Sequence, residues 1–317
     1  MGIVSITNGT IKADILTDVG GRIIFFGRTD GENVLESDPA LWEETAEERI
    51  IPTPETLDFK AYNGHEVWVG PQSLWWKQQD LNEDKLHSTL FWPPDPYISF
   101  GNYTILEQHN NKIIIESEKS PISGIVITKE IEIDTTGKLH FTATIKNIRT
   151  TVVEWDIWFV TRVNGHNLNF APINSPDEVT LSEPSHPYQG RPRYKTEEGF
   201  FSFTPLDKDP NYEECTGKAF IRSYHPLIAT VCGDELFVLQ YTHHDAETIH
   251  PEQSEIELYN FVHQERKKSL LELEYHSPFQ TLKPNEKMSS SMSWELIPLN
   301  NIREEREIRK ILTTFVK

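Results

Sequence analysis

The sequence predicts an all-β fold, a large antiparallel sandwich or barrel. Segments in which apolar and polar residues alternate recur at regular spacing, and they amount to about fifteen or more strands. Helical periodicity is confined to the margins of the chain. No linker separates two strand-rich halves, so residues 1–317 are expected to form a single domain.

The N-terminal segments predict short strands and one helix. "IVSITNGTIKADIL" (3–16) is typical of two strands joined by a turn at "TNGT". "SDPALWEETAEER" (37–49) predicts a short surface helix, because Ser37 or Asp38 can cap it and Pro39 suits a first helical turn.

The rest of the chain continues the strand pattern. Residues 100–163 predict a β-meander with a hairpin at Asn110–Asn111, and 171–218 predict long loops with short edge strands. Strands return from 218. Residues 300–317 predict a terminal amphipathic helix docked on the body, with one apolar face formed by Ile302, Ile308, Ile311, Leu312 and Phe315.

Composition excludes several classes of partner and location. The 317 residues include 30 basic and 49 acidic ones, for a net charge of −19, and such a surface would repel nucleic acid. Two cysteines cannot build a disulfide framework. With no signal peptide and no apolar run of membrane-spanning length, we expect a cytoplasmic protein without membrane contact. The oligomeric state stays open.

Two aromatic stretches stand out. "NGHEVWVGPQSLWW" (63–76) and "FWPPDPY" (91–97) contain four of the eight tryptophans. Glycine and proline interrupt the alternation there, so both are predicted to be loops. Trp75 and Trp76 are expected to plug an end of the sandwich, whereas Trp68 and Trp92 could either plug it or bind a ligand.

Four segments together resemble the galactose mutarotase-like superfamily, which includes the aldose 1-epimerases. They are 18–36, 63–72 with 92–97, 158–172, and 255–296. The most specific pattern is Glu-x-Glu … Leu-x-Pro-x-Glu … Trp-Glu-Leu within 272–296, and it is closer to a branch of domain-of-unknown-function proteins than to true epimerases. The resemblance implies a supersandwich of two large antiparallel sheets, with a sugar groove across one concave face.

The resemblance also implies an acid and a base for opening a sugar hemiacetal. It nominates His166, in "RVNGHNLNF", as the acid and Glu274, in "LELEYHSP", as the base, although Gly165 interrupts the first motif. Strand alternation puts Glu272 and Glu274 on one face. That face could line a groove or meet water, and His166 could be a loop histidine bonded to backbone.

A sugar presents apolar C–H faces and hydroxyl rims, which aromatic rings and polar side chains recognise. The partner is therefore expected to be a small-molecule carbohydrate, and neither a cofactor nor a metal is expected. Several converging arginines would favour an anionic sugar, although the net charge is a reason not to assume this. The predicted substrate-binding residues are Arg22, His65, Trp68, Gln72, Trp92, Asp95, Arg162 and Glu272.

Alternatives remain at the sequence level. "THHDAETIHPE" (242–252) has metal-ligand residue types, but its spacing matches no standard site and a solvated loop is the favoured interpretation. The main hypothesis is a mutarotase or epimerase. A non-catalytic carbohydrate-binding protein of the same fold is the second, and a protein-binding aromatic patch is the third.

Overall fold

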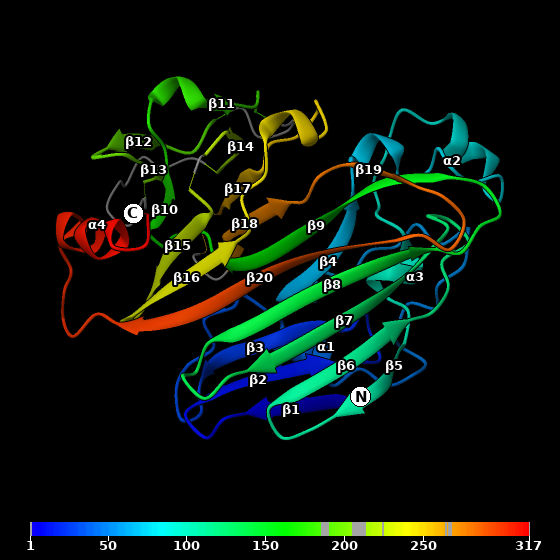
Figure 1. The fold of residues 1–317 in the computed structure, drawn as a ribbon, viewed down its shortest axis with the longest axis horizontal. Helices are drawn as coiled ribbons and strands as arrows, with labels where there is room; N and C mark the ends of the chain where they lie inside the picture. The colour runs from blue at the N-terminus through cyan, green and yellow to red at the C-terminus, as the bar shows by residue number, and fades with distance from the viewer. Residues whose placement is uncertain are drawn as a thin grey trace.

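The molecule consists of two ten-stranded antiparallel sheets packed face to face (Figure 1), which confirms the predicted large β-sandwich. The computed structural model describes residues 2–184, 190–204, 214–223, 225–263, 265 and 268–316. The first sheet runs in the order β1 (Ile3–Thr7), β2 (Ile11–Leu16), β3 (Arg22–Arg28), β4 (His65–Gly70), β9 (Val153–Asn164), β18 (Leu270–His276), β17 (Ile256–Val262), β14 (Cys215–Ile221) and β11 (Val179–Leu181), with β19 (Gln280–Leu282) paired to β9.

The second sheet faces the first along most of its length. Its order is β12 (Tyr194–Glu197), β13 (Phe200–Phe203), β10 (Asn169–Pro172), β15 (Leu227–Cys232), β16 (Glu235–Tyr241), β20 (Lys287–Pro298), β8 (Leu139–Asn147), β7 (Ile125–Ile133), β6 (Lys112–Ser117) and β5 (Tyr103–Gln108).

The main core lies between the two sheets. The alternate residues of each strand that point inward are apolar and fully buried, as along β7 and β8. Phe26 of the first sheet packs edge-on against Trp294 of the second, with ring centroids 5.2 Å apart. The alternation of apolar and polar residues along each strand therefore builds this core, as the sequence predicted.

The two predicted turns are confirmed, but the N-terminal helix is shorter than expected. β1 and β2 pair around residues 8–10, and β5 and β6 pair around 109–111. Helix α1 covers only Pro39–Trp42, with Asp38 accepting from the backbone N–H of Ala40. The predicted helix over 37–49 is wrong beyond Trp42, because none of its residues is buried against the body.

The stretch that the sequence predicts to be a loop contains a central strand. β4 pairs with β9 over its whole length and with β3 at one end, and all six of its residues are buried. Both faces of β4 are covered, so polar and apolar residues alike are enclosed and simple alternation is lost. The short helices α2 (Glu83–His87) and α3 (Pro96–Ser99) follow it.

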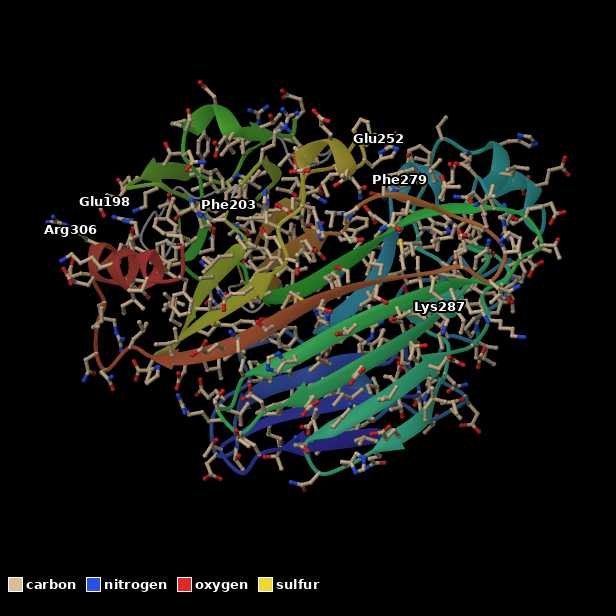
Figure 2. The ribbon with its side chains drawn as sticks, viewed as in Figure 1. Glu198, Phe203, Glu252, Phe279, Lys287 and Arg306 are labelled. Carbon is tan, nitrogen blue, oxygen red and sulfur yellow. The ribbon has the colours of Figure 1, made fainter. Side chains whose placement is uncertain are left out.

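The C-terminal helix α4 (Glu305–Thr313) docks on the outer face of the second sheet, as predicted. Ile308 and Leu312 are buried there against β10, β15 and β16, while Ile302, Ile311 and Phe315 pack at the margin. Glu198, in the β12–β13 turn, bonds Arg309 and lies near Arg306 (Figure 2). Part of the predicted loop region 171–218, residues 185–189 and 205–213, lies outside the described residues. No helix in the described ranges is long and apolar enough to cross a membrane.

Candidate functional site

The outer face of the first sheet carries an unusual number of charged and aromatic residues. Antiparallel register sets them in rows across β4, β9, β18, β17 and β14. One row contains Arg162, Glu272, Tyr259 and Lys218, as direct cross-strand neighbours. Segments 71–92 and 242–255 cover parts of this face, as shown by Trp75 stacked on Trp158 and by Gln253 bonded to His276.

A cavity of about 600 Å³ opens over this row. Its floor is the sheet and its walls are the loop before β4, the 3₁₀ turn Gln72–Leu74, and the segment after β11. Four tryptophan side chains contribute to its lining. The residues that line it are Phe59, Ala61, Asn63, Trp68, Gln72, Trp75, Trp92, Trp158, Arg162, Ser182, Glu183, Gly217, Lys218, Tyr259, Leu270 and Glu272.

One side of the floor is held by a chain of buried ion pairs. Arg162 donates to Glu272 at 2.7 Å and to Glu66, and Glu66 accepts in turn from Arg22 at 3.2 Å. Burial opposes ionisation of Glu66, but the two arginines hold its pKa below the ordinary value. The Arg162 guanidinium also lies over the Trp68 ring, 5.1 Å from its centroid. These contacts fix the Arg162 side chain in one position.

A second charged cluster lies under the other side of the floor. Lys218 contacts Glu257 at 2.6 Å and Glu274 at 2.9 Å, and its ammonium lies 4.9 Å from the centroid of Trp158. The Trp158 indole N–H donates to Glu274 at 2.8 Å. His276 has its Nδ1 3.2 Å from Asp156 and its Nε2 3.5 Å from Glu257. Glu257, Glu274, His276 and Asp156 are all buried.

Burial and mutual charge determine how this cluster titrates. Burial raises the pKa of Glu274 to about 7, although Lys218 opposes the shift. Burial lowers the pKa of His276, but Glu257 and Asp156 outweigh it and bring the value to about 9. The cluster is therefore a region of strongly negative potential, in which positive charge is stabilised.

One protein-family model matches almost all of the residues that form the two sheets. The family model of a domain of unknown function, DUF4380, matches residues 2–297. The chain belongs to the DUF4380 family. No curated protein matches the DUF4380 chain significantly.

Solved structures show that this DUF4380 chain has a galactose mutarotase-like fold. A candidate aldose 1-epimerase from Escherichia coli K12 superposes with a TM-score of 0.60 at 12% identity, over 94% of this chain and 99% of the other. A galactose mutarotase-like protein from Lactobacillus casei gives 0.59 at 12% identity, over 93% and 100%. A galactose mutarotase related enzyme from Lactobacillus acidophilus gives 0.53 at 10% identity, over 96% and 100%.

Five of the predicted site residues of the DUF4380 chain come together in the cavity. Trp68 and Arg162 form its floor with Glu272, whereas Gln72 and Trp92 form its walls. Glu274 lies just beneath, on the same face of β18 as Glu272, and is closed off by Lys218 and Trp158.

His166 is not brought next to Glu274. Its Nε2 lies 2.9 Å from the hydroxyl of Ser269, which precedes β18, while Glu274 is five residues further along the chain. At about 3.3 Å per residue the two side chains are separated by roughly 16 Å. The expectation that they meet across one hollow is therefore not met. The histidine that does lie near Glu274 is His276, with 3.9 Å between Nε2 and Oε2.

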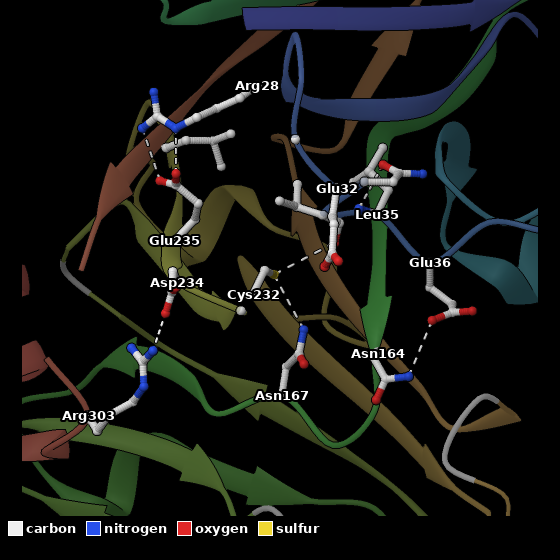
Figure 3. A pocket seen from close by; sticks show the side chains of 15 residues that line it. Arg28, Glu32, Leu35, Glu36, Asn164, Asn167, Cys232, Asp234, Glu235 and Arg303 are labelled. Carbon is white, nitrogen blue, oxygen red and sulfur yellow. Dashed lines mark hydrogen bonds and ion pairs between the residues drawn. The ribbon is translucent and has the colours of Figure 1, made fainter. Parts of the chain in front are cut away.

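The turn that carries His166 borders a different cavity, of about 580 Å³, just past the C-terminal end of β9 (Figure 3). Asn167 donates to the Cys232 sulfur there, and Asn164 bonds Glu36. Ion pairs formed by Arg28 with Glu235 and by Arg303 with Asp234 cross its margin.

Three predicted ligands of the DUF4380 chain lie elsewhere. His65 points into the core between the sheets, where its Nδ1 lies 2.9 Å from Thr161 and its ring meets Phe141 edge-on, because odd positions of β4 face inward. Arg22 is fully buried and holds Glu66 and the Ser99 carbonyl.

Asp95 is likewise structural. It caps α3 by accepting from the Tyr97 N–H, and it accepts from Ser120 and Ser123. Its carboxylate is therefore committed to backbone and hydroxyl groups of the fold. Asp95 does not line the cavity.

The His-rich segment 242–252 does not gather into a metal site. His243 pairs with Glu255 at 2.7 Å, and His250 packs edge-on against Phe279. Within the described ranges, the group of three candidate ligand side chains that comes within 4.8 Å is Glu257, Glu274 and His276.

Sequence reasoning missed several residues that build the site. Lys218 and Tyr259 lie on strands whose outward alternation pointed to them, and Glu66 was hidden in a stretch taken for a loop. Trp75, predicted to be a plug, is buried and yet lines the cavity.

Proposed function

We propose that the tryptophan-lined cavity binds a carbohydrate. The observation that carries this proposal is the combination of Trp68, Trp75, Trp92 and Trp158 with fixed polar groups in one hollow. Indole rings pack on the C–H faces of a sugar, and amide, carboxylate and phenol groups bond its hydroxyls. Asn63, Gln72, Tyr259 and Glu272 supply such groups around the aromatic walls.

The charges of the cavity favour an uncharged sugar. Arg162 is neutralised by Glu66 and Glu272, and Lys218 by Glu257 and Glu274. Each of these cations would have to give up a close carboxylate before it could bind a phosphate or a uronate. A neutral sugar needs no such exchange, because its hydroxyls can bond to groups that stay paired.

Binding is better supported than isomerisation. Opening a hemiacetal requires an acid and a base within reach of the sugar. His166 lies outside the cavity and Glu274 lies under Lys218, so neither reaches the hollow in this arrangement. The names of the structural neighbours, a candidate aldose 1-epimerase and mutarotase-like proteins, make anomer exchange the second candidate.

Replacing a cavity tryptophan should weaken sugar binding. Trp92 is 45% exposed and packs on Phe59 and Trp68, so Trp92→Ala should remove stacking area without breaking the core. Calorimetric titration with a panel of neutral monosaccharides, an amino sugar and a uronate should show affinity for a neutral sugar that falls about tenfold in this variant. Leu90→Ala is the control, since Leu90 is 74% exposed and does not line the cavity. Absence of binding across the panel, or equal losses in both variants, would contradict the proposal.

Polarimetry separates the two candidates. We expect the wild-type protein to bind the sugar and leave the rate of anomer exchange unchanged. A rate enhancement that disappears in Glu274→Gln, with affinity preserved, would select the isomerase instead.

A further inference from the structure

The buried cluster beneath the cavity contains two glutamates in an arrangement that calls for a cation. Glu257 and Glu274 are direct cross-strand partners on β17 and β18, on the same face of the sheet. Like charges opposite each other destabilise a strand pair, and they are costlier still out of water. Both side chains are at most 2% exposed.

His276 completes a set of three converging ligand types. Its Nδ1 lies 3.2 Å from Asp156 Oδ2 and 2.8 Å from the side-chain amide nitrogen of Gln253, and Asp156 also accepts from the Gly70 N–H at 2.7 Å. A carboxylate at Nδ1 is the usual means of orienting a metal-binding imidazole, because it holds a proton on that nitrogen, and a bound ion would replace the proton on Nε2. That Nε2 points toward the two glutamates.

The distances within the cluster are those of ligands around one ion. His276 Nε2 lies 3.5 Å from Glu257 Oε1 and 3.9 Å from Glu274 Oε2. These separations exceed a hydrogen bond. Around an ion with bonds of about 2.0 to 2.2 Å, neighbouring ligand atoms lie roughly 3 to 4.5 Å apart. His276 Nε2 and Glu274 Oε1 are both buried without a hydrogen-bond partner in the described part of the chain.

We propose that Glu257, Glu274 and His276 bind a divalent first-row transition cation such as Mn²⁺ or Zn²⁺. Two carboxylates and one imidazole suit these ions better than Ca²⁺ or Mg²⁺, which prefer all-oxygen shells. The proposal does not depend on sugar binding. It makes Glu274 a metal ligand, which agrees with a cavity that binds and does not isomerise.

Lys218 is the competitor for this place. Its ammonium contacts the Oε2 atoms of both glutamates, and its side chain, 20% exposed, borders the cavity. A metal ion entering from the cavity would displace the ammonium from Glu274 toward the hollow, where water can solvate it. Removing this charge should therefore strengthen metal binding.

The test is titration of the chelator-treated 317-residue protein with MnCl₂, with free Mn²⁺ measured by electron paramagnetic resonance. A parallel ZnCl₂ series is followed by thermal unfolding. We expect about one equivalent bound and a rise in the unfolding midpoint of several degrees. His276→Gln and Glu257→Gln should each weaken binding more than about tenfold. Lys218→Met should tighten it.

His243→Gln is the matched control, because His243 is also paired with a glutamate, in the neighbouring His-rich segment. Binding kept in this variant and lost in His276→Gln supports the site. Binding lost in His243→Gln and kept in His276→Gln would move the metal to 242–252 and overturn the proposal. No binding of either ion by the wild-type protein would also overturn it, leaving Lys218 and a protonated His276 to balance the charge of the glutamates. If the cluster variants fail to fold for reasons of stability, the wild-type protein provides the test. Its bound Mn²⁺ should show coupling to an imidazole nitrogen in the pulsed electron paramagnetic resonance spectrum. Absence of this coupling contradicts the proposal.

Discussion

At the scale of single residues, the buried charges on the outer face of the first sheet are tolerated because they are paired with one another. Glu66 lies between two arginines, and Lys218 lies between two glutamates. Removing one partner of such a pair leaves an uncompensated buried charge, which costs about 3 to 5 kcal/mol. The charged residues on the outer face of the first sheet therefore act as a unit, and they hold the cavity floor rigid.

Lys129 should make stability depend on pH. It is 1% exposed, donates to the carbonyls of Gly20 and Gly21, and burial lowers its pKa to about 7, with Arg22 adding to the shift. Between that value and 10.5, the unfolded chain binds a proton that the folded chain does not. The free energy of unfolding should therefore rise with pH over this window, by at most about 1.4 kcal/mol per unit from this group.

Urea unfolding at several pH values from about 7 to about 10 measures this dependence. Lys129→Met, which cannot titrate, should show a smaller slope than the wild type. Identical slopes in the two proteins would mean that Lys129 keeps its proton in the fold.

At the scale of elements, the position of β4 decides whether a site exists. Its inward residues join the core, its outward residue Trp68 forms part of the floor, and its outward residue Glu66 holds Arg162 of that floor. The sequence of this strand is bounded by Asn63-Gly64 and Gly70-Pro71, which signal turns. The signals were correct for the strand ends. The six residues His65–Gly70 form a strand because β9 supplies a full row of hydrogen bonds.

Gly64 should be essential to this placement. It has a φ of +72°, and a Cβ there would lie 2.2 Å from the Ile23 carbonyl oxygen, where β3 meets β4. Gly64→Ala should lower the free energy of unfolding by about 2 to 5 kcal/mol, from backbone strain together with the clash. Gly9→Ala is the control, since Gly9 has a φ of +95° and a Cβ added to it would meet nothing within 4 Å. Its cost should stay near about 1 to 2 kcal/mol, that of the backbone strain alone. Equal losses in urea unfolding would show that the contact with Ile23 is relieved by movement of the strand.

At the scale of the whole molecule, the site exists because loops cover the charged outer face of the first sheet. Glu272, Glu274 and His276 alternate with core residues, so the sequence placed them on one face. A face like this in an open sandwich would meet water. Here the tryptophan segment and the loop 242–255 close over it, and the exposed fraction of Glu274 and His276 falls to zero. Burial, together with the neighbouring charges, then shifts the pKa values of Glu274 and His276.

The sequence by itself determined a large antiparallel β architecture and the docked terminal helix through its patterning, whereas the family resemblance supplied the two-sheet arrangement and the candidate residues, five of which line the cavity. Period-two patterning and local turn chemistry depend on neighbours in the chain, and they can be read without the fold. Tertiary structure alone decided that His65 faces the core, that His166 contacts Ser269 outside the cavity, and that Lys218 meets Glu257 and Glu274. These placements depend on which strands pair and in what register, and strands such as β4 and β9 are brought together from positions about ninety residues apart.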